Sequence, residues 1–129
     1  MISKSDFLTK MRGVNPSITG EEPDFGSYDD AAEAAAKALA AMPGIGFASI
    51  RKRFNAFLAV CRHLDAMTEQ GEIDSGGAQL AVLILRLSNK PFLKAAVAFD
   101  INGPKLGIVD RVELPETARE YLAGINTYG

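Results

Sequence analysis

The chain has 129 residues, of which 47% are hydrophobic and 23% are charged, and its formal net charge is −2 at pH 7. This length indicates a single domain, residues 1–129, and this composition indicates a folded globular protein rather than a disordered one. The longest apolar run, residues 80–85, is far too short to cross a bilayer, and the charged start of the chain is not a secretory signal. We therefore expect a cytoplasmic protein that has no membrane partner.

The first third of the chain predicts two helices joined by a long acidic loop. The first helix ends at Gly13, and the second is alanine-rich and covers residues 28–42. Candidate caps precede each helix: Ser3 or Ser5 for the first, and Ser27 or Asp29 for the second. Between the helices, residues 13–27 combine glycines and prolines with acidic side chains, a composition typical of a loop. The alanines give the second helix a thin surface that favours close packing against another helix.

The best-defined element is a helix over residues 47–70, which Gly71 ends. Its apolar residues recur every three or four positions and define one buried face: Phe47, Ile50, Phe54, Phe57, Leu58, Cys61, Leu64 and Met67. The polar residues of the opposite side are Arg51, Lys52, Asn55, Arg62 and His63. Cys61 is the only cysteine, so no internal disulfide can form, and its place on the apolar face predicts an unreactive core thiol. We expect Leu83 and Leu87 to pack against this face.

Residues 78–88 are apolar nearly all round, which indicates a central element covered by its neighbours. Periodicity alone leaves a buried helix and a buried strand open, while the length of the segment and the cap site at Asp74 or Ser75 favour a helix. Pro91 then starts either a short helix or an extended segment that runs to Phe99.

The C-terminal part of the chain predicts a turn and a final helix. Residues 97–101 and 106–114 flank a turn at 102–104 and read as a small β-hairpin. Pro115 opens a last helix that ends at Gly124. The resulting fold class is mainly α, a compact bundle of five or six helices with a small β-hairpin near the C-terminus.

The charges fall in blocks along the chain. Residues 13–33 contain six acidic and no basic residues, residues 34–63 contain five basic and no acidic residues, and residues 64–77 contain four acidic and no basic residues. Three of the basic residues, 51–53, lie at the start of a predicted helix, where the helix dipole disfavours cations. Either the acidic loop lies over them, with Arg53 pairing to a carboxylate, or an acidic partner binds there. The candidate partners of Arg53 are Glu21, Glu22 and Asp24.

Residues 38–54 contain a helix, a corner at 43–46 and the cationic start of the next helix. This arrangement resembles the helix-hairpin-helix motif of DNA-repair and replication proteins. The resemblance implies that backbone N–H groups at Gly44 and Gly46 face a phosphate, that Ile45 plugs the space between the helices, and that binding is not sequence-specific. The side chains on or near the same element are Ser49, Arg51, Lys52 and Arg62. The same corner is also an ordinary way to stop one helix and start another, and both interpretations stay open at this point.

The sequence contains no recognisable catalytic motif, cofactor fingerprint or metal-ligand set, so we expect no enzyme, no cofactor and no metal site. The leading hypothesis is a non-enzymatic protein–protein interaction or assembly module, acting on a protein partner or on a second copy. Three features favour it: the high apolar content, the charge blocks and the absence of catalytic groupings. The thin alanine helix and the apolar residues 80–87 favour self-association in particular. The alternative is a non-sequence-specific nucleic-acid-binding module that uses the corner and the basic helix side.

Overall fold

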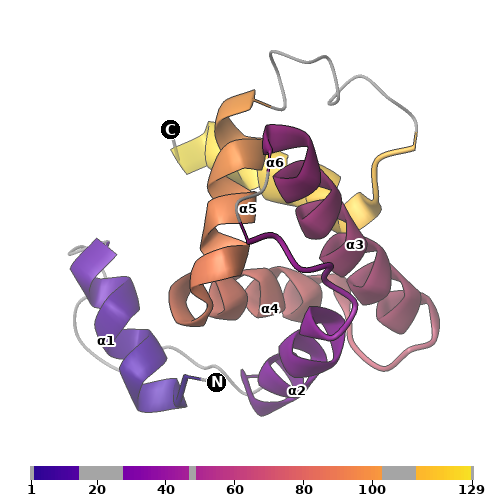
Figure 1. Cartoon of the computed structure of the whole chain (residues 1–129). Coiled ribbons are helices and arrows are strands. Elements are labelled where there is room, and N and C mark those ends of the chain that lie inside the picture. The colour runs from indigo at the N-terminus through magenta and orange to yellow at the C-terminus, as the bar shows by residue number, and fades with distance from the viewer. Residues whose placement is uncertain (1, 15–27, 47–48, 103–112, 129) are drawn as a thin grey trace.

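The computed structural model describes residues 2–14, 28–46, 49–102 and 113–128. Within these ranges the chain forms six α-helices and no β-strand (Figure 1). The helices are α1 (Lys4–Val14), α2 (Tyr28–Leu39), α3 (Ile50–Glu69), α4 (Ser75–Ser88), α5 (Lys90–Asn102) and α6 (Glu116–Tyr128). The predicted mainly α class is confirmed. No helix in the described ranges is both long enough and apolar enough to cross a membrane.

The predicted β-hairpin near the C-terminus is wrong. Its first arm, residues 97–101, lies inside α5, and residues 103–112 lie outside the described ranges. The apolar residues that alternate over positions 97–101 suggested a strand, but these five positions are part of a longer helix with a helical repeat of apolar residues. The buried positions of α5 follow that repeat: Phe92, Ala95, Ala96, Ala98 and Phe99. The side chain of Asn89 caps the helix, because its Oδ1 accepts a hydrogen bond from the Phe92 N–H at 2.8 Å.

Helix α4 occupies the middle of the molecule and contacts each of the other five described helices (Figure 1). The segment predicted as either a buried helix or a buried strand is therefore a helix, and its central place is confirmed. Asp74 caps it, since Oδ1 accepts from the Gly77 N–H at 2.7 Å. Glycine is needed at position 77, because a Cβ there would lie 2.5 Å from Cγ1 of Ile73.

Helix α2 uses its alanines inside the chain. The helix packs mainly against α4. Four of its alanines are buried: Ala31, Ala34, Ala35 and Ala38. The helix ends at Leu39 rather than at residue 42. The next three residues continue as a tighter turn, with each N–H bonded to the carbonyl three residues earlier.

Helix α3 has the predicted apolar face and supplies the centre of the core. Four residues of the predicted apolar face are fully buried: Phe54, Phe57, Cys61 and Leu64. The Phe57 ring lies 4.5 Å from that of Phe99, 5.6 Å from that of Phe92 and 5.0 Å from that of Tyr121, measured between ring centroids. These aromatic rings take the place expected for Leu83 and Leu87, which are only half-buried at the edge of the core.

Two features of the predicted α3 differ in the structure. Ile50 was placed on the buried face but is 48% exposed. A helix face is buried only where a neighbouring element covers it, and Ile50 is the first residue of α3. The helix begins at Ile50, after the Ser49 cap, whose Oγ accepts from the Lys52 N–H at 3.3 Å. Phe47 lies outside the described residues.

The terminal helices complete the bundle. Ser3, one of the two predicted caps, caps α1 by accepting a 3.2 Å hydrogen bond from the Asp6 N–H. The ring of Phe7 in α1 packs against that of Tyr28, with 5.4 Å between the ring centroids. Helix α6 begins directly after Pro115 but continues past Gly124, the predicted end, because a single glycine inside a helix costs only about 1 kcal/mol relative to alanine. The predicted acidic loop, residues 13–27, lies outside the described residues except for its first two positions, which end α1.

The aromatic packing predicts the effect of one core substitution. Phe57→Ala should lower the free energy of unfolding by about 3–5 kcal/mol, because it opens a cavity among three aromatic neighbours. Asn55→Ala, on the exposed side of the same helix, should change it by less than about 0.5 kcal/mol. Urea unfolding followed by circular dichroism measures both, and equal losses for the two variants would show that this helix face is assigned incorrectly.

Candidate functional site

The corner between α2 and α3 has an anchored centre and an exposed backbone. Ile45 is 8% exposed and belongs to the core cluster, whereas Gly44 and Gly46 on either side of it are exposed. Gly46 has φ 33°, in the left-handed region that favours glycine. Burial of Ile45 therefore holds the corner against the bundle and leaves the backbone of both glycines at the surface.

The predicted basic residues lie on the exposed side of α3. Arg51, Lys52 and Arg62 are exposed, and none of them belongs to an ion pair within the described ranges. Arg51 and Arg62 are eleven residues apart on nearly the same side, which corresponds to about 16 Å along the helix axis. Arg53 is half-buried, as its flanking position predicts. Its candidate acidic partners lie outside the described residues, so the expectation that they neutralise it stays a prediction.

Sequence reasoning missed an exposed apolar stripe on α5. Leu93 is 38% exposed, Ile101 is 56% exposed, and Val97 lies half-buried between them at four-residue spacing. Lys90 and Lys94 are exposed on the same side of the helix. We call these five residues the α5 face. The four-residue spacing is visible in the sequence, but residues 91–99 were left open between a helix and an extended segment, and residues 97–101 were assigned to a hairpin arm.

A polar cluster joins α4, α5 and α6 inside the bundle. Nη1 of Arg86 lies 2.9 Å from Oδ2 of Asp100, and the hydroxyl of Tyr121 donates to the same Oδ2 at 3.2 Å. Arg86 also donates to the Tyr121 hydroxyl. Burial raises the pKa of the Asp100 carboxyl, against the opposing effect of Arg86, and burial and Asp100 raise the pKa of Tyr121. The second carboxylate oxygen, Oδ1 of Asp100, is buried and has no hydrogen-bond partner in the described part of the chain.

Asp65 caps a helix far from it in sequence. One carboxylate oxygen accepts from the Glu116 N–H at 2.8 Å, and the other accepts from the Thr117 N–H at 2.9 Å and from the Thr117 hydroxyl at 2.6 Å. Pro115 stands at the cap position of α6 and has no polar side chain, so α3 supplies the missing acceptor. In the sequence Asp65 was only a member of an acidic block, and no local pattern links it to residues 116–117.

The thiol that the sequence predicts to be unreactive lies in the core. Cys61 is fully buried, and burial raises the pKa of its thiol well above the usual range. His63 is half-buried on the polar side of α3. Within the described ranges, no three or more His, Cys, Asp or Glu residues are grouped so that they could hold a metal ion.

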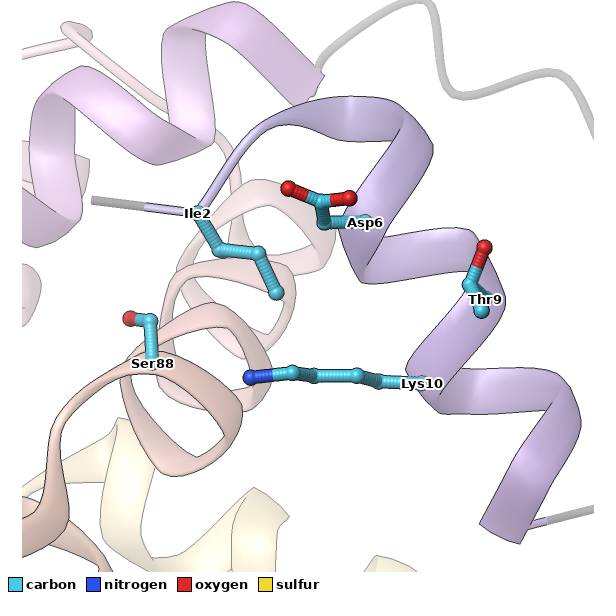
Figure 2. A pocket seen from close by; sticks show the side chains of 5 residues that line it. All are labelled: Ile2, Asp6, Thr9, Lys10 and Ser88. Carbon is cyan, nitrogen blue, oxygen red and sulfur yellow. The ribbon is translucent and has the colours of Figure 1, made fainter.

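An open pocket of about 360 Å³ lies where α1 meets the end of α4 (Figure 2). Figure 2 shows side chains from α1 on one side of it and Ser88 on the other; the lining residues are Ile2, Asp6, Thr9, Lys10 and Ser88. Nζ of Lys10 donates to the Leu87 carbonyl at 3.0 Å. This contact satisfies a carbonyl at the end of α4 and holds α1 in place, which gives the lysine a structural task.

No protein-family model matches the chain, and it has no significant match among curated proteins or solved structures.

The Asp65 cap generates a testable prediction. Asp65→Ala should lower the free energy of unfolding by about 1–2 kcal/mol, because the first N–H groups of α6 lose their acceptor. The matched control is Glu69→Ala, an exposed carboxylate one turn further along α3, for which we expect a change below about 0.5 kcal/mol. Hydrogen exchange should also accelerate in α6 of the Asp65 variant. Unchanged exchange in α6 would contradict the capping role.

Proposed function

We propose that the chain is a non-enzymatic protein–protein interaction module that contacts its partner through the α5 face. One observation carries the proposal. Within the described ranges, three large hydrophobic residues are exposed, and two of them, Leu93 and Ile101, lie along one side of α5 with Val97 between them. An apolar stripe of this kind on a helix is typical of a surface that another helix covers.

The proposed interaction surface differs from the two features that suggest assembly in the sequence, the alanine-rich helix and the apolar residues 80–87. Four alanines of α2 and the central apolar residues of α4 pack within the chain itself, while Leu80, Leu83 and Leu87 are half-buried at the edge of the core. The large apolar side chains with the greatest exposure on one helix are instead those of α5. The polar clusters are also occupied, since Asp65 caps α6 and Arg86 pairs with Asp100. These occupied polar groups support a binding role rather than a catalytic one.

Site-specific photo-crosslinking tests the proposal. A benzophenone amino acid placed at Leu93 should form an adduct with a discrete protein in cells that naturally produce the chain. The same probe at Asn55, exposed on the opposite side of the neighbouring helix α3, is the matched control and should form no such adduct. Equal adducts from both positions, or none from Leu93, would contradict an interaction through α5.

A nucleic-acid-binding function is the second candidate, favoured by the corner. The exposed backbone of Gly44 and Gly46 adjoins a helix whose exposed cations, Arg51, Lys52 and Arg62, have no ion-pair partner in the described part of the chain. Exposed amides and cations together suit contact with a phosphate backbone.

Salt-titrated fluorescence anisotropy with labelled DNA duplexes of two sequences tests this second function. Arg51→Glu and Arg62→Glu should each weaken binding equally for both sequences, and each should reduce the salt slope by about one, because one phosphate is no longer neutralised. Lys94→Glu, which reverses an exposed charge on α5 instead, should leave binding nearly unchanged. Failure of the unmodified chain to bind either duplex at low salt would exclude this function.

A further inference from the structure

We propose that the α5 face binds an acidic amphipathic helix of a partner protein, a proposal that rests on the interaction function above. The apolar side chains of that helix lie along Leu93, Val97 and Ile101, and its carboxylates face Lys90 and Lys94. Three properties of α5 lead to this partner chemistry: the spacing of the exposed residues, the sign of the exposed charge, and the inward direction of the only acidic side chain of the helix.

The spacing suits a helix as the occupant. Positions 93, 97 and 101 recur at four-residue intervals, the spacing of a ridge by which one helix packs against another, and Lys90 and Lys94 lie beside them. At 100° per residue, all five members of the α5 face fall within about 100° of the helix circumference. The stretch from Leu93 to Ile101 rises about 12 Å, so a partner helix of three to four turns covers it.

The charge selects an acidic partner. Lys90 and Lys94 are exposed at the start of α5, where the helix dipole adds to their positive potential. Asp100 is the only acidic residue of α5, and its side chain is 15% exposed because Oδ2 pairs with Arg86. The α5 face therefore offers apolar contacts and positive charge without a carboxylate. Glutamates beside the apolar stripe of a partner complement that charge.

The same charges disfavour a second copy of the chain as the occupant. Two α5 faces packed on each other would bring four lysines, and no carboxylate of either α5 face, to the seam. Their apolar contact would consist of three half-exposed side chains from each copy, which is small for a stable interface. A partner with acidic residues avoids the repulsion, and the small contact area predicts a reversible, low-affinity complex.

A pair of synthetic peptides tests the proposal on the full chain. Both are 18-residue amphipathic helices with leucines on one side; one carries glutamates beside the leucines and the other carries lysines at the same positions. In a titration followed by ¹⁵N–¹H NMR up to ~1 mM peptide, a range suited to weak complexes, the acidic peptide should shift the amide signals of residues 90–101. The basic peptide should not shift them.

Two sets of variants sharpen the result. Lys90→Glu together with Lys94→Glu should exchange the preference, so that the basic peptide binds and the acidic one does not. Leu93→Ser together with Ile101→Ser should abolish binding of both peptides while the signals of α3 keep their positions, because both side chains are exposed.

Four outcomes would overturn the proposal: equal binding of both peptides, shifts centred on α3, no shift at the highest concentration, or a dimer of the unmodified chain in sedimentation that the serine variant lacks. The proposed function is tested separately. A crosslink from Leu93 to a protein, with no binding of the acidic peptide, would preserve the interaction role and reject this class of partner.

Discussion

The packing of Phe57 against α5 and α6 is the interaction on which the rest of the structure depends. Its ring contacts those of Phe92 and Phe99, which lie seven residues apart and therefore on one side of α5. That contact fixes the rotation of α5 about its axis. The same rotation turns Leu93, Val97 and Ile101 outward and brings Asp100 to Arg86. The exposed apolar stripe and the half-buried ion pair are thus two results of one aromatic contact.

Polar contacts position α6 more narrowly than aromatic packing, because a hydrogen bond requires a particular distance and angle. Helix α6 is held by its cap at Asp65, by a 2.8 Å hydrogen bond from Gln79 to the Thr117 carbonyl, and by the Tyr121 hydroxyl in the cluster with Asp100. Removing charges from water is costly, so such a cluster is weak evidence for added stability. Its contacts require side chains of α4, α5 and α6 to lie within hydrogen-bonding distance of one another, which ties the three helices together.

The sequence predicted those parts of the fold that local spacing determines. The buried face of α3 follows its three- and four-residue repeat, and the caps at Ser3 and Asp74 follow from residue type. Spacing could not show where a face stops being covered, which is why Ile50 was misplaced, and five alternating residues were mistaken for a strand. The contacts of Asp65 with residues 116–117 and of Arg86 with Asp100 join distant helices, so no local pattern predicts them. At the candidate site, the exposure of the basic residues was predictable, whereas the α5 face required the actual packing.

The cap that α3 provides for α6 also makes the stability of α6 depend on α3. Nucleating a helix is unfavourable, and helices of 12–15 residues are only marginally stable alone in water. Helix α6 has 13 residues and follows a proline that offers no side-chain acceptor. Its first turn is completed by the Asp65 carboxylate, which α3 holds in place. The first turn of α6 therefore loses its acceptor whenever the part of α3 around Asp65 unfolds, so the stability of one helix end depends on an intact helix elsewhere in the chain.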